Sequence, residues 1–423
     1  MKAFKKVLII SYTFPPAPGI GGRRWAKFGK YLLQKNIDVS IVAAENQLHP
    51  KTSSWVNDIS HYSNNISYLS SGYPKYLGIN PQRFFHKLLY RISLLYAKAR
   101  LKGNYYDKSG YWEKYLLKTT EHFIKRGGEN IVVTVAPFRS AFFLIKLKRK
   151  FPQINFIIDF RDPWLYNKTA YGFESLSLRR KKFEMNAEME VIKNFDKIIT
   201  VAEEMTKELT IRYPDHQKKF ITIPNGFDKD DFITKNAEID HNKKSKLVLI
   251  FTGTFYVKAL HLLNKLFEAL TLLKANNPDV YNDFEFNFYG ETTFNTSEFI
   301  KMHGNVNFYG NITLDEVYIK IKKANACMLF LTDDINYSLS TKFCEYISQR
   351  KPVIVFSRPG ETSSYIEKNN IGIAISPETE IIYKKLLEIY FLFKENKLMI
   401  NDSFDISQFD IEILSEKVKN ILI

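Results

Sequence analysis

The stretch KVLIISYTFPPAPGIGGRRWAKFGKYLLQ, residues 6–34, carries the pattern that decides the fold. It starts with Lys6–Ser11, a short apolar run that is typical of a buried strand. A loop rich in glycine and proline follows, and apolar residues then recur at helical spacing over Arg23–Gln34. A second apolar run lies at Val39–Ala44, so the order of strand, turn, helix and strand predicts the start of a parallel sheet.

The rest of the first half repeats this alternation. Further strands are predicted at Ile131–Val135, Phe156–Asp159 and Lys197–Val201, and a helix at Ser177–Asn194. The segment Ile221–Asp228 ends this half. Residues 229–246 are polar and lack periodicity, which is typical of a linker.

The pattern then begins again with a strand at Leu247–Phe251, a turn at Thr252-Gly253-Thr254 and a helix at Leu260–Lys274. Further strands are predicted at Phe284–Tyr289, Val306–Tyr309, Ala326–Leu331 and Pro352–Phe356, and helices at Leu314–Ala324, Thr341–Arg350 and Asp405–Ile423. We therefore predict an α/β protein with two Rossmann-like, doubly wound domains that face each other across a cleft. The predicted domains are residues 1–228 and 245–400, with a linker at 229–244 and a C-terminal helix at 401–423 that could pack back on the first domain.

The net charge of +16 indicates an anionic partner, which could be nucleic acid, an anionic membrane surface or a phosphorylated substrate. Residues 84–101 (FFHKLLYRISLLYAKARL) combine apolar residues at helical spacing with lysines and arginines. Such a helix can lie on a bilayer, although an ordinary surface helix has a similar pattern. No compact nucleic-acid motif is evident, so we expect no nucleic-acid partner.

The compartment is predicted from segments that the sequence lacks. The run Val7–Ile10 is too short for a signal peptide, and no stretch approaches the length of a transmembrane helix. We therefore expect a cytoplasmic protein that could be peripheral on the inner face of the cell membrane. Cys327 and Cys344 suit small buried hydrophobes better than a disulfide or a zinc site. The histidines are scattered and Asp228-Lys229-Asp230 lies in a polar loop, so we expect no metal.

Three segments carry charged groups where parallel-sheet proteins bind ligands. Gly21, Gly22 and Arg23 follow the first strand and open the first helix, as in a loop that approaches a phosphate. The spacing is not that of a dinucleotide fingerprint, and a purely structural turn is the alternative.

Arg161 and Asp162 follow a second buried strand, in the segment Asp159–Trp164 (DFRDPW). Charged residues at this end of a strand are candidates for chemistry. The alternative is an arginine–aspartate pair that holds the turn.

The third segment opens the helix at Thr341–Arg350. Ser340 or Thr341 can cap it, because a hydroxyl accepts a hydrogen bond from a free helix N–H. Lys342 lies in the first turn, where the helix dipole disfavours a cation, so an anionic ligand explains it better. Glu345 lies one turn further on, within reach of hydroxyl groups, and Lys258 is a second candidate for binding phosphate.

In order and spacing, these motifs resemble those of GT-B glycosyltransferases of the retaining family 4, in the subgroup that acts on cell-surface polysaccharides. The resemblance covers nearly the whole chain. It rests on FPPxxGxGGRRxxKxxxxL at Phe14–Leu32, APFRSA at Ala136–Ala141, DFRDPW at Asp159–Trp164, IPNGFD at Ile223–Asp228, TGTFY at Thr252–Tyr256, FYG at Phe288–Gly290 and STKFCEY at Ser340–Tyr346.

The resemblance implies that the C-terminal half binds the nucleotide sugar without a cofactor or a metal. Glu345 matches the second glutamate of the family's Glu-x7-Glu motif, which holds the ribose hydroxyls. Lys258 and Lys342 would contact the diphosphate, and Gly21 and Gly22 would approach it from the other domain. The remaining donor-binding candidates are Arg23, Gly253, Thr254, Gly290, Ser340 and Thr341.

Two positions depart from the family pattern. Tyr337 replaces the first glutamate, and Arg161 stands where a histidine is common. The expected function is transfer of a sugar, with retention, from a UDP- or GDP-sugar to a lipid-linked saccharide in polysaccharide or lipopolysaccharide synthesis. Arg161 or Asp162 would meet the acceptor or the reacting centre. The alternatives are a nucleotide-sugar epimerase and a non-catalytic binding subunit of a polysaccharide assembly complex.

Overall fold

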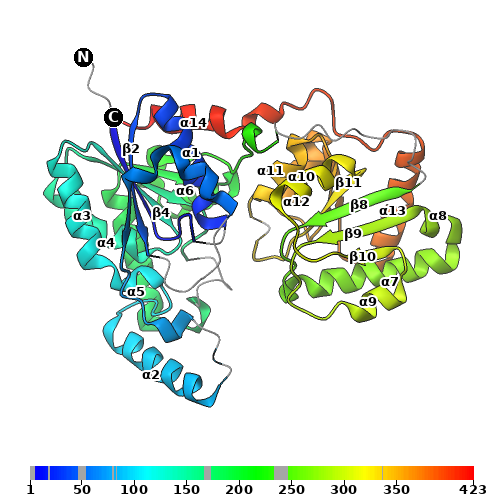
Figure 1. Cartoon of the computed structure of the whole chain (residues 1–423), viewed down its shortest axis with the longest axis horizontal. Helices are drawn as coiled ribbons and strands as arrows, with labels where there is room; N and C mark the ends of the chain where they lie inside the picture. The colour runs from blue at the N-terminus through cyan, green and yellow to red at the C-terminus, as the bar shows by residue number, and fades with distance from the viewer. Residues whose placement is uncertain are drawn as a thin grey trace. The chain divides into compact units, whose positions relative to one another are not determined.

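The computed structural model describes residues 5–17, 20–45, 54–78, 81, 83–165, 173–232, 246–335 and 337–423. The chain forms two compact units. The first comprises Met1–Pro224 together with Ile411–Ile423, and the second comprises Asn225–Asp410. Each unit is built on one parallel sheet (Figure 1). The predicted α/β class with two Rossmann-like domains is therefore confirmed.

The first unit has a seven-stranded sheet with the order β3-β2-β1-β4-β5-β6-β7. Its strands are β1 (Lys6–Ser11), β2 (Asp38–Ala44), β3 (Ile66–Leu69), β4 (Asn130–Val135), β5 (Asn155–Phe160), β6 (Lys197–Thr200) and β7 (Phe220–Thr222). Its α-helices are α1 (Arg23–Gln34), α2 (Phe84–Arg100), α3 (Glu113–Lys125), α4 (Arg139–Lys150), α5 (Leu178–Asn194), α6 (Glu203–Arg212) and α14 (Ile411–Asn420). Its 3-10 helices are η1 (Ile20–Gly22), η2 (Ser54–Asn65), η3 (Lys75–Gly78), η4 (Lys108–Tyr111), η5 (Phe173–Ser175) and η6 (Pro214–Lys219).

The centre of this sheet is covered on both faces. Every residue of β4 and β5 is buried, which requires apolar layers above and below, because successive side chains of a strand point to opposite faces. In register, Val7 of β1 lies between Val39 of β2 and Asn130 of β4. The strand order therefore changes direction at β1, and the carboxyl ends of β1 and β4 form the switch point at which open parallel sheets bind ligands.

The last helix of the chain belongs to the first unit. Ile411, Leu414 and Val418 of α14 are buried in the same apolar cluster as Trp25 and Phe28 of α1, and the two helices lie side by side (Figure 1). The backbone passes between the units at 224/225 and at 410/411, whereas the sequence placed these boundaries at 228 and 400. Within the predicted linker, η7 (Lys229–Asp231) is helical, and 233–245 lie outside the described residues.

The second unit has a six-stranded sheet with the order β10-β9-β8-β11-β12-β13. Its strands are β8 (Leu247–Thr252), β9 (Phe284–Tyr289), β10 (Val306–Phe308), β11 (Ala326–Phe330), β12 (Val353–Phe356) and β13 (Gly372–Ile375). Its α-helices are α7 (Leu260–Asn276), α8 (Pro278–Asp283), α9 (Ser297–Met302), α10 (Leu314–Lys323), α11 (Thr341–Ser348), α12 (Glu361–Asn369) and α13 (Thr379–Lys394), and its 3-10 helices include η9 (Val257–Ala259) and η10 (Ile406–Phe409).

Two apolar clusters sandwich this second sheet. Leu249 and Phe251 of β8 pack in the cluster that contains α7 and α13, whereas Ile250 packs in the cluster that contains α10, α11 and α12. Consecutive residues of one strand thus enter opposite layers, as a doubly wound sheet requires. Cys327 and Cys344 are buried and unbonded to each other, as predicted.

No helix in the described part of the chain is both long enough and apolar enough to cross a bilayer. This finding agrees with the absence of a long apolar run in the sequence.

A buried charge pair joins α1 to β5 in the first unit. The Asp159 carboxylate is fully buried and accepts hydrogen bonds from Nε of Arg24 at 3.1 Å and from Nε1 of Trp25 at 2.5 Å. The Arg24 guanidinium also donates to the carbonyl oxygens of Ile223 at 2.7 Å and Pro224 at 2.6 Å. The pair therefore fixes the first helix against the central strand and the end of the unit.

Removing one partner of this pair should destabilise the first unit strongly. We expect Asp159→Ala and Arg24→Leu each to lower the free energy of unfolding by about 3–5 kcal/mol, because each leaves an uncompensated buried charge. The double variant Arg24→Leu/Asp159→Leu should lose less than the sum of the two. Tryptophan fluorescence during urea unfolding measures this unit selectively, because all four tryptophans precede residue 224. Glu208→Ala, at an exposed position of α6, is the control and should change stability by less than about 0.5 kcal/mol.

Candidate functional site

The candidate site in the second unit lies where the strand order changes direction, between β8 and β11. Thr252 ends β8, Gly290 follows β9, and α11 begins at Thr341. The geometry brings these segments together. A Cβ atom on Gly253 would lie 2.7 Å from Cε of Lys342, and one on Gly290 would lie 2.3 Å from the carbonyl oxygen of Gly253.

Both glycines have backbone conformations that other residues rarely adopt. Gly253 has a φ of +96° and Gly290 has a φ of +131°. The N–H of Gly253 donates to the Tyr289 carbonyl at 2.7 Å, and the N–H of Gly290 donates to the Gly310 carbonyl at 2.6 Å. The predicted glycines thus let two loops approach each other, which leaves backbone rather than side chains beside Lys342.

The start of α11 is held from three directions. Ser340 is the N-cap, and its hydroxyl accepts a hydrogen bond from the N–H of Phe343 at 3.2 Å. The carbonyl of Leu339 accepts from the Asn225 side chain at 3.1 Å, and the carbonyl of Ser338 accepts from the Thr362 hydroxyl at 3.0 Å. The cap is therefore Ser340 rather than Thr341, and the first turn of this helix has a fixed position.

Lys342 lies in that first turn. Its ammonium nitrogen lies 4.3 Å from the centre of the Phe251 ring, and its stem contacts Gly253. Within the described part of the chain, no carboxylate forms an ion pair with it. Burial lowers the pKa of Lys342 to about 8, and the negative charge of Glu345 opposes this shift. The helix dipole further disfavours a cation at this end, so the site is set up for an anion.

Glu345 and Tyr346 follow on the same helix. Glu345 is buried, at 8% exposure. The Tyr346 hydroxyl accepts a hydrogen bond from the N–H of Thr252 at 3.0 Å and forms a second with the Thr252 hydroxyl at 3.0 Å. These bonds join α11 to the end of β8, and burial raises the pKa of Tyr346.

Lys258 and Thr254 lie on the loop after β8. The Lys258 ammonium pairs with Asp334 at 3.5 Å, and its side chain is 56% exposed. Lys258 therefore has a carboxylate partner and a side chain that is more than half exposed, whereas Lys342 is partly buried and has no ion-paired carboxylate among the described residues. Thr254 is partly buried directly after Gly253. Of the two lysines, Lys342 is therefore the better placed to bind an anion.

The glycines predicted in the first unit lie in η1, after the described part of the loop that follows β1. A Cβ atom on Gly22 would lie 2.6 Å from both Cα of Phe14 and the Thr13 carbonyl oxygen, so this position requires glycine for packing. Arg23 is buried, at 3% exposure. Gly22 therefore has a structural reason for its identity, beside any role toward a ligand.

Arg161 joins three loops at the carboxyl edge of the first sheet. Its guanidinium donates to the Gly21 carbonyl at 2.6 Å and to the Ala136 carbonyl at 2.9 Å. Arg161 thus connects the end of β5 to the segments after β1 and β4, which is a positioning contact. Asp162, next to it, is partly buried. Their predicted catalytic roles remain predictions.

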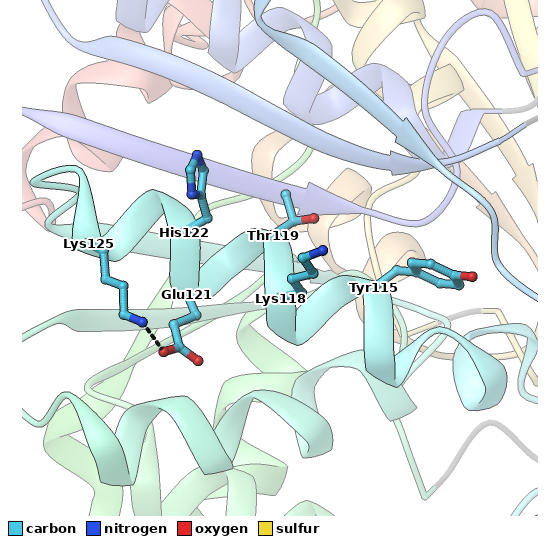
Figure 2. Close-up of a pocket in the computed structure, with 6 residues that line it drawn as sticks. All are labelled: Tyr115, Lys118, Thr119, Glu121, His122 and Lys125. Carbon is cyan, nitrogen blue, oxygen red and sulfur yellow. Dashed lines mark ion pairs between the residues drawn. The ribbon is translucent and has the colours of Figure 1, made fainter.

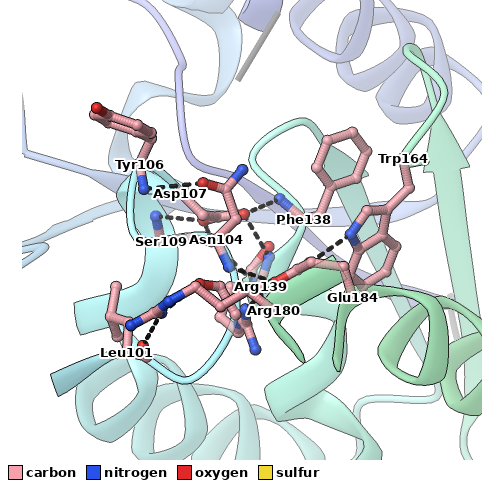
Figure 3. A network of polar contacts seen from close by, with 12 residues as sticks. Leu101, Asn104, Tyr106, Asp107, Ser109, Phe138, Arg139, Trp164, Arg180 and Glu184 are labelled. Carbon is pink, nitrogen blue, oxygen red and sulfur yellow. Dashed lines mark hydrogen bonds and ion pairs between the residues drawn. The ribbon is translucent and has the colours of Figure 1, made fainter. Parts of the chain in front are cut away.

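A buried network at this edge was not foreseen from the sequence (Figure 3). Glu184 of α5 pairs with Arg139 and accepts hydrogen bonds from Nε1 of Trp164 at 2.8 Å and from the N–H of Asn104 at 2.6 Å. Its members come from four separate segments, which explains why local patterns do not reveal it. Two members lie in motifs noted in the sequence, Arg139 in APFRSA and Trp164 in DFRDPW, but neither motif indicates their common partner.

Asp107 extends the network to the start of α4. Its Oδ2 accepts hydrogen bonds from the N–H groups of Phe138 at 2.8 Å and Arg139 at 3.0 Å (Figure 3). Its Oδ1 accepts from the N–H of Ser109 at 2.9 Å. Asp107 therefore satisfies N–H groups at the start of α4 and fixes the loop after β4.

A hollow of about 650 Å³ lies elsewhere on the first unit, along α3 (Figure 2). Its lining residues are Tyr115, Lys118, Thr119, Glu121, His122 and Lys125. They come from this one helix, and Glu121 pairs with Lys125 at 2.7 Å and with Lys150 at 2.9 Å. These side chains form an open surface on one helix, and its only carboxylate is already paired with lysines, so the carboxyl edges of the sheets remain the better candidates.

Known structures place this architecture in a fold class. No protein-family model matches the sequence, and no curated protein matches it either. The structure of WaaG, a glycosyltransferase involved in lipopolysaccharide biosynthesis, aligns with a TM-score of 0.56 and 14% identity over 98% of this chain and 99% of that one. The chain has the GT-B fold.

Two further GT-B structures extend this comparison. HepE from Anabaena, solved in complex with UDP, aligns with a TM-score of 0.60 and 10% identity over 99% of both chains. The putative UDP-N-acetylglucosamine 2-epimerase of Listeria monocytogenes aligns with a TM-score of 0.56 and 12% identity over 99% of this chain and 95% of that one. The GT-B fold therefore accommodates both glycosyl transfer and epimerisation, and the family 4 resemblance stays a prediction.

The close approach of Gly290 to Gly253 can be tested with alanine. Gly290→Ala should destabilise the second unit by more than about 2 kcal/mol, because it combines a positive φ with a clash against backbone. Gly310→Ala has a φ of +70° but open space around its Cβ, so it should cost about 1 kcal/mol. Gly304→Ala has neither problem and should be close to neutral.

Differential scanning calorimetry of the three variants provides the measurement. Equal midpoints for Gly290→Ala and Gly310→Ala would show that the contact between the two loops imposes no constraint of its own.

Proposed function

We propose that this protein is a glycosyltransferase that takes a sugar from a nucleotide sugar, UDP- or GDP-linked, and transfers it to a lipid-linked saccharide. The observation that carries the proposal is Lys342. This partly buried ammonium group lies at the N-terminus of α11, against Gly253, and has no carboxylate ion pair in the described part of the chain. Such a cation stabilises a compact, doubly charged ligand such as a diphosphate.

The nucleotide-sugar donor would occupy the carboxyl edge of the second sheet. Its diphosphate would accept hydrogen bonds from Lys342 and from the N–H groups at the start of α11, with Ser340 and Thr341 beside it. Glu345 would accept hydrogen bonds from the ribose hydroxyls. Lys342 and the helix dipole would stabilise the departing diphosphate, which is the task that a metal performs in other transferases, so we propose no metal or cofactor.

The carboxyl edge of the first sheet would bind the acceptor. Arg161 would hold the loops after β1 and β4 in position through its two carbonyl contacts, and Asp162 would meet the acceptor or the reacting centre. Retention would follow from attack on the same face as the departing phosphate oxygen, which would take the acceptor proton. This part of the proposal rests on the resemblance in sequence motifs.

We propose the lipid-linked acceptor and the cellular location together, because an acceptor carried on a membrane lipid requires an enzyme that works at the membrane. The resemblance to enzymes of polysaccharide synthesis and the fold shared with WaaG both favour a saccharide carried on a membrane lipid. Such an acceptor would place the protein in the cytoplasm, at the inner face of the cell membrane.

A nucleotide-sugar epimerase is the second candidate, because the fold is shared with a putative UDP-N-acetylglucosamine 2-epimerase. Radiolabelled UDP- and GDP-sugars incubated with the protein distinguish the two functions. A transferase should move the label to the lipid fraction of a membrane extract, whereas an epimerase should convert the free donor without any acceptor. If no nucleotide sugar is bound or turned over, the proposed function is wrong.

Lys342→Met should weaken UDP binding while it stabilises the free protein. Loss of a charge-assisted hydrogen bond costs about 1.5–3 kcal/mol, so we expect at least about a tenfold increase in Kd. The variant no longer has the desolvation cost of the buried ammonium group. The midpoint of thermal unfolding of the free protein should therefore rise by about 2–4 °C for each kcal/mol of that cost. Titration calorimetry and scanning calorimetry measure the two effects. Lys385→Met, at a partly exposed lysine that pairs with Glu388, is the control and should change neither.

The pH dependence of binding follows from the same lysine. The pKa of Lys342 in the free protein is about 8, below the usual value of 10.5, so the ammonium form is complete only below pH 8. A bound diphosphate favours that form, and affinity for UDP should therefore fall as the pH rises above 8. Because the folded pKa is depressed, the stability of the free protein should rise over the same interval. Lys342→Met should show neither change.

A further inference from the structure

The outer face of α2 is apolar and exposed. At about 100° per residue, Phe84, Phe85, Leu88, Ile92, Leu95, Tyr96 and Ala99 fall within one arc of about 120°. Phe84 is 86% exposed and Leu95 is 67% exposed. Six large apolar side chains on one exposed arc are unusual for a helix that faces water.

The opposite face of α2 already packs on the first unit. Ala97 is fully buried in a small cluster that also contains Tyr105 and Leu176. Arg180 of α5 donates to the carbonyl oxygens of Lys98 and Leu101, which fixes the C-terminal end of the helix. The apolar arc is therefore the outward side of a helix that is docked in place, and Figure 1 shows α2 at the outside of its unit.

Cations border this arc on both sides. Lys87, Arg91 and Lys98 fall along one flank and Arg100 along the other, and α2 contains no acidic residue. The exposed Leu178 and Arg179 begin α5, the helix whose Arg180 contacts the C-terminal end of α2. The whole surface therefore combines exposed apolar groups with positive charge alone.

The charge pattern selects among the possible occupants of this surface. A second copy of the chain, paired through α2, would bring like charges together, which is unfavourable. An anionic bilayer supplies both an apolar interior for the aromatic and aliphatic side chains and negative headgroups for the flanking cations.

We propose that α2, together with the start of α5, is a membrane-docking surface that lies in the interface of an anionic bilayer. The evidence for docking is the geometry of α2. The role that we give to docking, which is to bring the protein to a lipid-linked acceptor, rests on the proposed function.

Aromatic contacts connect this surface to the carboxyl edge of the first sheet. Tyr96 of α2 stacks on Tyr111 with ring centres 6.1 Å apart, and Tyr111 contacts Tyr73 at 6.1 Å. Trp112, the next residue, contacts Tyr12, which directly follows β1, at 5.3 Å. Docking through α2 would therefore place the bilayer next to the segments that lead to the proposed acceptor edge.

Sedimentation of the full-length protein with lipid vesicles tests the docking. Vesicles of phosphatidylcholine are compared with vesicles that also contain phosphatidylglycerol. We expect binding to the anionic vesicles, weakened by salt because headgroup charges are screened. Leu88→Ser/Ile92→Ser/Leu95→Ser and Lys87→Gln/Arg91→Gln/Lys98→Gln should each reduce that binding at least about tenfold.

Matched variants on other surfaces control for general changes in polarity and charge. Ile211→Ser/Ile381→Ser/Met399→Ser removes three apolar residues that are exposed elsewhere, and Lys265→Gln/Lys385→Gln/Lys397→Gln removes three surface cations. Both should bind vesicles like the unmodified protein. Equal binding by the α2 variants, or no binding by the unmodified protein, would overturn the proposal.

Two further measurements separate the alternatives. Light scattering gives the oligomeric state, and a dimer that dissociates in the α2 variants would assign this surface to a second copy instead. Thermal shift with UDP tests the proposed function independently. Vesicle binding without UDP binding rejects the nucleotide-sugar proposal and keeps the docking, whereas the reverse result rejects the docking alone.

Discussion

All strands that pair in the two sheets run parallel, and the remaining structure follows from this constraint. A parallel strand cannot be joined to its neighbour by a tight hairpin, so the chain must cross a face of the sheet each time. Every strand then delivers its carboxyl end to the same edge. Main-chain groups beyond the strands must be satisfied there by caps, glycine loops and charged side chains, which is why both candidate sites lie at such edges.

The cations at the carboxyl edges of the two sheets have different kinds of partner. In the first unit, three arginines at the edge have acceptors: Arg24 has Asp159, Arg139 has Glu184, and Arg161 has two carbonyl groups. These contacts are structural, since they join helices and loops to the sheet. In the second unit, Lys342 has an aromatic ring and a glycine instead of a carboxylate. A partly buried cation with no ion-paired carboxylate lowers stability, and the proposed diphosphate would supply the missing anion.

Lys342 departs from the rule that buried charges are paired, and the surface of α2 departs from the rule that exposed helix faces are polar. Its outer face exposes apolar groups that a water-facing helix would replace by polar ones. Both features are unfavourable in water, and the partners proposed above, a diphosphate at Lys342 and an anionic bilayer at α2, would each relieve one of them. The folded chain therefore indicates its partners at the places where it departs from the rules that stabilise a water-soluble protein.

Local patterns in the sequence are sufficient to predict the alternation of strands and helices, the two α/β halves and the importance of Gly253, Gly290 and Lys342. These features depend on local periodicity and on residues with unusual backbone or charge properties, which can be recognised over a few neighbouring positions. These patterns did not reveal β13, they offered the packing of the C-terminal helix on the first domain only as one possibility, and they left the partners of Arg161 and Arg139 open. These features are visible only in the folded chain, because burial and pairing depend on residues that are distant in the sequence. Arg161 donates to a carbonyl 140 residues away, and Arg139 pairs with a carboxylate 45 residues away.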